Sequence, residues 1–278
     1  MKILFRVLFA FGLLLLAINV TGLFRTMRNP ALYDLEHSIK NRINDVVIKY
    51  PDIKKELVKK AGESEYDFAV RVNATVHDGF AHYWKTAGIE KFHMRVPVWE
   101  NYLLWAASYV KPDRYERYEF SNYKKNLERG VGLCSSHCIV VNGVLKDNGI
   151  KAELLDVGGR HVVTRAELND GKTLMLDPDF GVVIPYDTAD VTLNPELVRA
   201  PYSRMADLYY PEAKDPYTTE LMVDIFGKRK YVYEVKNWFE DFSYWAIWLI
   251  PIADVAGNTG LGSQKESECV SSCSGYYV

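Results

Sequence analysis

Three residues in the middle of the chain have the side-chain types of a catalytic triad. Cys134 follows the stretch Gly130-Val-Gly-Leu and precedes an apolar pattern of helical spacing, which places its thiol at the start of a predicted helix. A helix N-terminus stabilises a thiolate, because its backbone N–H groups are unpaired and the helix dipole is positive there. His161 begins a predicted strand and Asp177 ends the next one, so antiparallel pairing would bring the carboxylate beside the imidazole.

The chemistry that these residue types support is acyl transfer through a thioester. Asp177 would orient His161, His161 would exchange a proton with Cys134, and the thiolate would attack a carbonyl carbon. His161 would then protonate the leaving amine, and water or a second amine would release the acyl group. A cysteine at a helix start is on its own more often structural, so it is the order of the three residues that favours a nucleophile.

Two alternative interpretations use neighbouring residues. Asp179 competes with Asp177 for the orienting role because residues two apart share one face of a strand, although we favour Asp177. Side chains that zinc prefers are also present: Cys134, His137, Cys138 and His161. The separated Cys-x-x-Cys pairs of a strong zinc signature are missing, and Cys138 is expected to be a buried apolar residue. We therefore expect no metal and, since no glycine-rich phosphate loop precedes a helix, no cofactor.

The elements that must position the triad follow from local patterns. A helix is predicted over Cys134 to Asn148, with Gly149 at its C-cap. Four strands follow it: Lys151 to Val157, His161 to Leu168, Lys172 to Asp177 and Val182 to Tyr186. Asn169-Asp170-Gly171 joins the second and third strands, and Asp-Gly favours a tight hairpin because it tolerates positive backbone angles.

The region before the triad is predicted to be helical. Apolar residues recur at steps of three and four in three segments: Tyr33 to Tyr50, ended by Pro51; Tyr66 to Trp84, with Gly88 as its stop; and Val98 to Val110. His77 and His82 in the second segment are not at a ligand spacing, and we treat them as ordinary residues.

The N-terminus has the pattern of a membrane segment. The run from Val7 to Phe24 carries no charge and is apolar on all sides, with Lys2 and Arg6 before it and Arg25 after it. Val20 and Gly22 give only a weak signal-peptide cleavage site, and nothing like Ala-x-Ala is present, so we favour an uncleaved anchor. Basic residues lie on both sides of the segment, so their distribution does not fix its orientation. We expect a single-pass membrane protein whose catalytic part is outside the cytoplasm.

Composition limits the classes of partner. The chain has 278 residues, 48% of them hydrophobic and 25% charged, which is typical of a folded protein of one or two domains. The net charge of -2 provides no basic surface for phosphates, so we exclude a dedicated nucleic-acid binder. Nothing in the sequence sets the oligomeric state.

The C-terminal third is less regular. The uncharged run from Phe242 to Ala253 is too short to span a bilayer, and it is either a core helix or an aromatic segment at the membrane interface. Cys269 and Cys273 could pair outside the cytoplasm. We divide the chain into a membrane segment (1–28), a helical region (29–119), a core that carries the triad (120–187), a helical and aromatic extension (188–257) and a loose polar tail (258–278).

The core segments are similar to a known superfamily. Gly-Val-Gly-Leu-Cys134, Gly-Arg-His161-Val-Val-Thr and Leu-Met-Leu-Asp177-Pro178 resemble the motifs of transglutaminase-like proteins over roughly residues 120 to 187. The resemblance implies an α+β fold with a papain-like core, in which a helix that carries the cysteine packs on an antiparallel sheet. It also implies the roles of nucleophile for Cys134, base for His161 and orienter for Asp177. For the oxyanion site we expect the N–H of Cys134 and, as weaker candidates for a second donor, Tyr123 or Asn126.

The superfamily includes proteases, amidases and cross-linking enzymes, so the resemblance does not fix the reaction. We expect a membrane-anchored cysteine enzyme that acts on amide bonds of a protein or peptide, by hydrolysis or by transfer to an amine. Two alternatives remain: a catalytically silent binding module, and an acyltransferase that uses a coenzyme thioester, as arylamine acetyltransferases do.

Overall fold

The computed structural model describes residues 2–33, 46–209, 216–235 and 238–271. They pack into two compact units, each built from segments that are distant in the sequence. The larger unit contains residues 27–94 and 118–236, and the smaller unit contains residues 1–26, 95–117 and 237–278. The chain is α+β, and the predicted triad lies in the larger unit.

The larger unit is built on a five-stranded antiparallel sheet with the order β6-β5-β4-β3-β7. The strands are β3 (Lys151–Val157), β4 (His161–Glu167), β5 (Thr173–Asp177), β6 (Val182–Ile184) and β7 (Lys230–Val232). Four of them lie within one or two residues of the ranges predicted from the sequence. Asp170 and Gly171 are in the tight connection between β4 and β5, where Gly171 has a φ of 81°.

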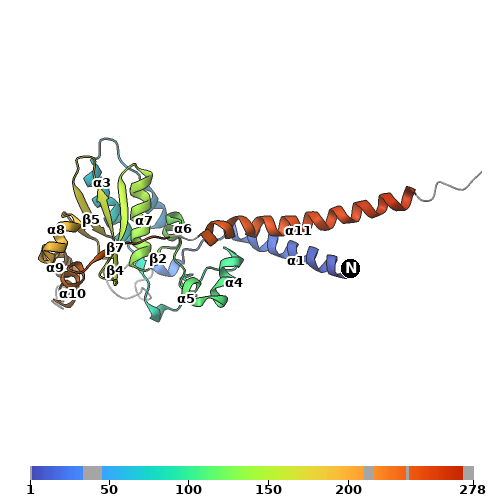
Figure 1. Ribbon diagram of the computed structural model, residues 1–278, viewed down its shortest axis with the longest axis horizontal. Helices are drawn as coiled ribbons and strands as arrows, with labels where there is room; N and C mark the ends of the chain where they lie inside the picture. The colour runs from blue at the N-terminus through green and yellow to red at the C-terminus, as the bar shows by residue number, and fades with distance from the viewer. Residues whose placement is uncertain (1, 34–45, 210–215, 236–237, 272–278) are drawn as a thin grey trace, which may run out of the picture. The chain divides into compact units, whose positions relative to one another are not determined.

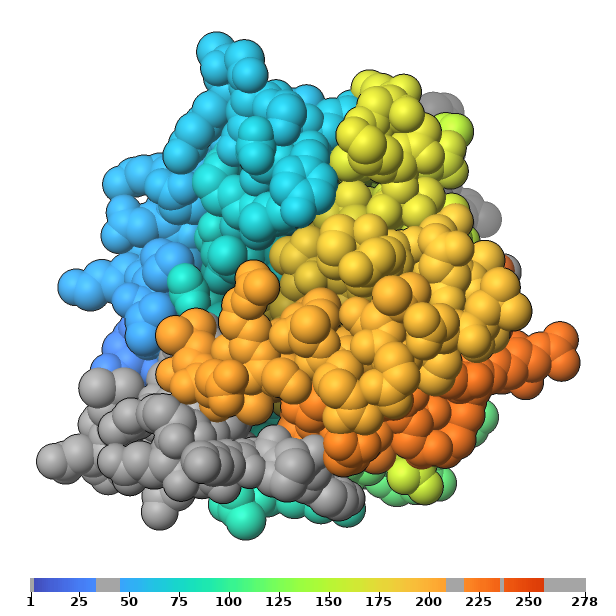
Figure 2. Space-filling view, turned by 90° about the vertical axis from the view of Figure 1, so that its left-hand side faces the viewer, coloured from blue at the N-terminus to red at the C-terminus, as the bar shows by residue number. Residues whose placement is uncertain are grey.

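Helices cover both faces of this sheet (Figure 1). One face packs against α2 (Tyr50–Glu56), α3 (Glu65–Gly79), α6 (Tyr123–Arg129) and α7 (Cys134–Asp147). The other packs against α8 (Thr188–Leu193), α9 (Arg199–Tyr209) and α10 (Pro216–Phe226). Side chains alternate between the two layers along β5, since Leu174 and Leu176 face α7 whereas Met175 faces α9. On the face in Figure 2, the residues of α2 and α3 lie beside the β4–β5 hairpin and the segment that contains α8 to α10.

A short parallel pair brings another part of the chain to the start of α7. Strand β1 (Ala81–His82) pairs with β2 (Val131–Gly132), directly before Cys134. The predicted helix from Tyr66 to Trp84 is therefore wrong at its end, because α3 stops at Gly79. The backbone is extended at Phe80, and Arg28 Nη2 donates to the Gly79 carbonyl at 2.5 Å. Beyond β1 the chain continues as the 3-10 helix η3 (Lys85–Ala87).

Two other helix boundaries differ from the prediction. Pro51 does not end a helix: it is in the first turn of α2, where a proline has no intrahelical hydrogen bond to lose. The rest of the predicted segment from Tyr33 lies largely outside the described residues, apart from the 3-10 helix η1 (Pro30–Tyr33). The stretch from residue 258, which we expected to be loose, has a helical backbone to Ser271, since extending a helix costs less than starting one. The side chains of Cys269 and Cys273 lie outside the described set.

The described residues of the smaller unit form four helices. They are α1 (Lys2–Gly22), α4 (Tyr102–Val110), α5 (Pro112–Tyr115) and α11 (Trp238–Ser271). The predicted helix from Val98 begins instead at Tyr102, where Asn101 caps it by accepting from the N–H groups of Leu103 and Leu104. The segment Ile3–Gly22 is long and apolar enough to cross a membrane, and it lies alongside α11 (Figure 1).

Candidate active site

The fold brings His161 and Asp177 into contact. His161 Nε2 lies 2.7 Å from Asp177 Oδ2, and both side chains are buried. The pairing of β4 with β5 explains this contact, because Asp177 follows Leu176, which pairs with Thr164 three residues after His161. The carboxylate therefore reaches the imidazole diagonally across two adjacent strands.

Cys134 completes the group from the first turn of α7. Leu133, the N-cap residue, has an extended backbone, so Cys134 is the first helical residue and its N–H has no acceptor within the helix. Burial by itself lowers the pKa of His161. The charge and hydrogen bond of Asp177, with a hydrogen bond to Cys134, outweigh it and raise the His161 pKa well above its ordinary value. All three residues predicted from the sequence thus lie together.

Asp177 has other hydrogen-bond partners besides His161. Its Oδ1 accepts from the backbone N–H groups of Asp179 and Phe180 at 3.2 and 3.3 Å, and its Oδ2 also accepts from the hydroxyl of Tyr202 at 2.5 Å. Tyr202 comes from α9 and is fully buried. Burial and the neighbouring Asp177 charge raise the pKa of Tyr202 well above its ordinary value, so the phenol stays a neutral donor. The sequence alone did not indicate Tyr202, because its contact with Asp177 depends on how α9 packs on the sheet.

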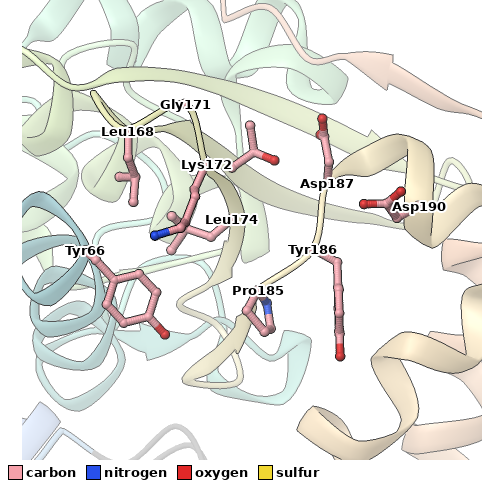
Figure 3. A pocket seen from close by; sticks show the side chains of 10 residues that line it. Tyr66, Leu168, Gly171, Lys172, Leu174, Pro185, Tyr186, Asp187 and Asp190 are labelled. Atoms are coloured by element: carbon pink, nitrogen blue, oxygen red, sulfur yellow. The ribbon is translucent and has the colours of Figure 1, made fainter.

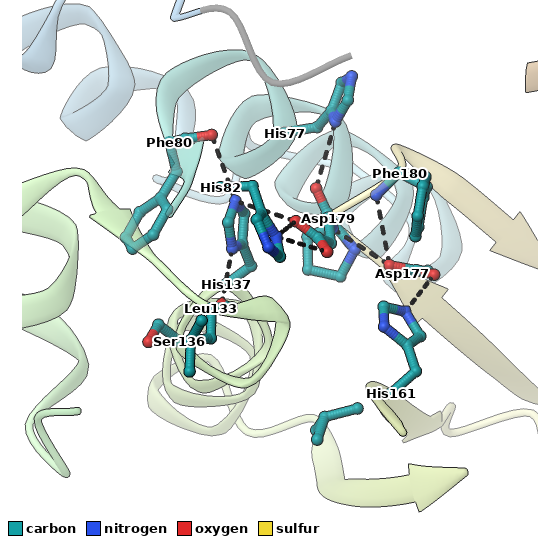
Figure 4. A network of polar contacts seen from close by, with 12 residues as sticks. His77, Phe80, His82, Leu133, Ser136, His137, His161, Asp177, Asp179 and Phe180 are labelled. Atoms are coloured by element: carbon teal, nitrogen blue, oxygen red, sulfur yellow. Dashed lines mark hydrogen bonds and ion pairs between the residues drawn. The ribbon is translucent and has the colours of Figure 1, made fainter. Parts of the chain in front are cut away.

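Asp179 does not compete for His161. It binds His82 of β1, whose Nδ1 lies 2.8 and 3.0 Å from its two oxygens, and it lies 3.6 Å from Nε2 of His137 (Figure 4). Burial alone would raise the pKa of Asp179, but the two histidines hold it well below its ordinary value. Burial lowers the pKa of His137, whereas Asp179 outweighs burial at His82 and raises its pKa. A second buried carboxylate–histidine cluster thus adjoins the first.

From the sequence we predicted no particular role for His82, but in the fold it binds Asp179. Strand β1 carries it to the start of α7, whereas a helix continuing to Trp84 would have given it different neighbours. Its ring stacks at 6.3 Å from the ring of His137. His77, also treated as ordinary, is buried with Nδ1 3.3 Å from the Pro178 carbonyl, so it contacts the chain between Asp177 and Asp179.

His137 and Cys138, two of the residues considered for zinc, bind backbone carbonyls instead. His137 Nδ1 lies 2.9 Å from the Leu133 carbonyl and its Nε2 lies 3.3 Å from the Phe80 carbonyl. Cys138 is buried, as expected, and its thiol donates to the Val162 carbonyl at 3.0 Å. Within the described residues, no group of three or more histidines, cysteines or carboxylates is arranged to hold a metal ion.

The two side chains proposed as second oxyanion donors are engaged elsewhere. Tyr123 donates to Asp147 at 2.6 Å, at the far end of α7 from Cys134. Asn126 is fully buried, and its amide binds the backbone N–H and carbonyl of Phe120. Both predictions are therefore wrong, since these side chains fix the chain before α7. The N–H of Cys134 remains the donor that the helix geometry favours.

A polar group also surrounds the first turn of α7. Glu119 accepts from the hydroxyls of Ser135, of Ser136 at 3.0 Å and of Tyr233 at 2.7 Å. Tyr233 follows β7, and it packs with Cys134 against the cluster that contains Cys138. Ser135 and Ser136 are next to Cys134 in the sequence, so this network fixes the turn that carries the thiol.

A half-open surface pocket is lined by other residues. It has a volume of about 280 Å³ and is lined by Tyr66, Leu168, Lys172, Tyr186 and Asp190, among others (Figure 3). Leu174 of β5 also lines the pocket and is three residues before Asp177, about 10 Å along the strand, but Cys134, His161 and Asp177 are not among the lining residues. The pocket is therefore not the site of the Cys134 chemistry.

Comparison with known proteins adds no family to this geometry. No known family, no curated protein and no solved structure matches the chain. The arrangement of Cys134, His161 and Asp177 is therefore the observation from which a function can be inferred.

Proposed function

We propose that the protein is a membrane-anchored cysteine enzyme that acts on amide bonds through a thioester, with a core of the papain-like, transglutaminase-like type. The buried contact of 2.7 Å between His161 and Asp177 carries this proposal, because it gives His161 a raised pKa beside Cys134. A helix that begins at the cysteine and packs on an antiparallel sheet also supports it.

The steps follow from the geometry. Asp177 binds Nε2 of His161, so the other ring nitrogen is left for Cys134. That nitrogen takes the thiol proton, which gives a thiolate beside an imidazolium. The thiolate attacks the amide carbonyl and forms a C–S bond. His161 then gives its proton to the amine as the C–N bond breaks. Water, deprotonated by His161, attacks the thioester, and the C–S bond breaks to return the thiol.

Hydrolysis and cross-linking differ only in the molecule that accepts the acyl group from the thioester. Hydrolysis is favoured where the site meets water, and an amine in place of water would give a cross-link. We infer a protein or peptide substrate and a position outside the cytoplasm. The position is tested with Asp170→Cys, an exposed site in the β4–β5 hairpin, and a maleimide that does not cross membranes. Labelling of this cysteine only after the cells are opened would contradict an extracytoplasmic site.

The proposal is tested by the rate of iodoacetamide labelling of Cys134 against pH. The full-length protein in detergent carries Cys138→Ala, Cys269→Ser and Cys273→Ser, so that Cys134 alone reacts. We expect labelling to persist well below the free-thiol pKa of about 8.5 and to slow near neutral pH when His161 is replaced by Ala. Labelling that follows a free thiol in both proteins would remove the enzyme proposal and favour a binding module. Circular dichroism of the His161→Ala variant controls for loss of the fold.

A further inference from the structure

Helix α11 runs antiparallel to α1 in close contact. Asn19 Nδ2 of α1 donates to the Ile247 carbonyl of α11 at 2.6 Å. Further along, a Cβ atom on Gly12 would lie 2.7 Å from Asp254 Oδ2 and 3.3 Å from the Pro251 carbonyl. From Asn19 to Gly12 the contacts move seven residues towards the start of α1, and from Ile247 to Asp254 they move seven residues towards the end of α11. The antiparallel pairing therefore continues along the part of α1 that is long and apolar enough to span a membrane.

The exposed face of α11 is apolar, which is unusual for a helix in a water-soluble protein. One face, exposed, carries Trp238, Phe242, Trp245, Leu249 and Ile252 at steps of three and four, with Trp245 72% and Leu249 59% exposed. The buried face is mixed, because it contains the polar Glu240 and Ser243 as well as Ala246 and Ile247. A helix in water rarely exposes so large an apolar face, so the exposed face of α11 favours contact with lipid.

The backbone of α11 is also adapted to a place without water. Pro51 begins a helix, but Pro251 lies inside one and has no N–H to donate to the Ile247 carbonyl four residues earlier. Two protein groups replace that donor: the amide of Asn19 at 2.6 Å and the hydroxyl of Tyr102 at 3.1 Å. Neighbouring helices satisfy proline-freed carbonyls in this way where lipid offers no hydrogen bond.

Aromatic residues are concentrated in the smaller unit, and one of them lies at the end of α1. Five of the 6 tryptophans of the chain belong to the smaller unit: Trp99, Trp105, Trp238, Trp245 and Trp248. The guanidinium of Arg25, just after α1, lies 5.8 Å from the centre of the Trp99 ring, and Gly22 meets the Trp99 carbonyl so closely that a Cβ atom would clash. Tryptophan and arginine are typical of the interface between lipid and water.

We propose that α11 crosses the same bilayer as α1, as its antiparallel partner. From Phe242 to Gln264 the only charged residue is Asp254, and such a helix is about 34 Å long, enough for a hydrocarbon core of about 30 Å. The run from Phe242 to Ala253 alone looked too short, but α11 continues as one helix to Ser271. Asp254 is placed against Gly12 of α1, where an ionisable residue of a membrane helix is expected to face protein.

This topology places both ends of the chain on one side of the membrane and the larger unit on the other. It does not depend on the chemistry of Cys134. It also means that a reporter fused after residue 278 reports the side opposite to the triad, so the side of the larger unit must be measured within that unit.

The first experiment tests contact with lipid. Leu249 and Leu208 are both exposed leucines, at 59% and 70%, but Leu208 is in α9 of the larger unit. Each is replaced by Cys in the full-length chain without its natural cysteines, and membranes are treated with a water-soluble maleimide. We expect Leu208→Cys to react at least ten times faster, and detergent denaturation to remove the difference. Equal rates in intact membranes would overturn the proposal.

The second experiment tests crossing. One full-length chain keeps only Cys273, and the other has Asp170→Cys as its only cysteine. In intact cells, an impermeant maleimide is expected to label one of them, and the other only after the membrane is opened. Labelling of both from the same side would show that α11 returns without crossing, or lies along the surface, and would overturn the proposal whatever the activity of Cys134.

Discussion

The hydroxyl of Tyr202 and Nε2 of His161 bind the same oxygen of Asp177, at 2.5 and 2.7 Å. Asp177 is therefore fixed from two sides, by a strand and by a helix that lies on the opposite face of the sheet from α7. The orientation of the imidazole thus depends on α9 as well as on the strand pairing.

Replacing Tyr202 by Phe removes one hydrogen bond to a buried carboxylate and keeps the ring. We expect the free energy of unfolding to fall by about 1–3 kcal/mol, because the lost bond involves a charged acceptor. Thermal unfolding in detergent measures the change. Tyr231→Phe is the matched control, since this tyrosine is 54% exposed and no change in stability is expected there. Equal effects of the two substitutions would contradict the structural role of the phenol.

Asp177→Asn and Asp179→Asn separate the two carboxylate–histidine clusters. Asp177→Asn removes the charge that raises the His161 pKa, so alkylation of Cys134 near neutral pH should slow at least tenfold. Asp179→Asn leaves that contact intact and instead weakens the binding of His82, so alkylation should stay within about threefold of the unchanged protein. The iodoacetamide assay at several pH values compares them. The reverse order would assign the orienting role to Asp179.

The pH dependence of stability follows from the direction of the His161 shift. His161 binds its proton more tightly in the folded protein than in the unfolded chain, whose histidine pKa is about 6.5. Its contribution is thus fully present below pH about 6.5 and is lost as pH rises through the higher folded-state pKa. We expect His161→Gln to lower the melting temperature most at pH 6 and progressively less towards pH 10. A difference that grows with pH would contradict the sign.

The end of α7 allows a test of backbone strain alone. Gly149 has a φ of 78°, and no atom lies within 4 Å of a Cβ added there. Gly149→Ala should cost about 1 kcal/mol, because only glycine adopts this conformation freely. Gly257→Ala, in a helix and also with open space, should be neutral or slightly stabilising. Chemical denaturation of both variants measures the contrast, and a neutral Gly149→Ala would show that the helix ends differently.

The central strands could be predicted because their signals are local. From Lys151 to Ile184, alternation, β-branched residues and the Asp-Gly turn all lie within the segments that they define. The contact of His161 with Asp177 could be inferred for the same reason, since it joins neighbouring strands.

The rest of the site depends on contacts between distant segments. Phe80 and Tyr83 continue the apolar period of α3, but they are buried directly before and directly after strand β1, and the period alone does not distinguish a helix from a strand here. His82 reaches Asp179 only because β1 pairs with β2. Tyr202 reaches Asp177 only because α9 packs on the sheet. The positions of Tyr123 and Asn126 near Cys134 in sequence suggested oxyanion donors, but the fold uses both to fix the chain before α7.

One turn of the chain, Asp177-Pro178-Asp179, serves both clusters, because its two carboxylates bind different histidines. Deleting Pro178 would shift one carboxylate relative to the other and separate at least one of them from its imidazole. Segment length is thus as constrained as residue identity here, whereas the exposed hairpin at Asn169 to Gly171 has room for additional residues. Among natural variants of this chain, insertions and deletions should therefore collect in the hairpin and be missing from residues 177 to 179.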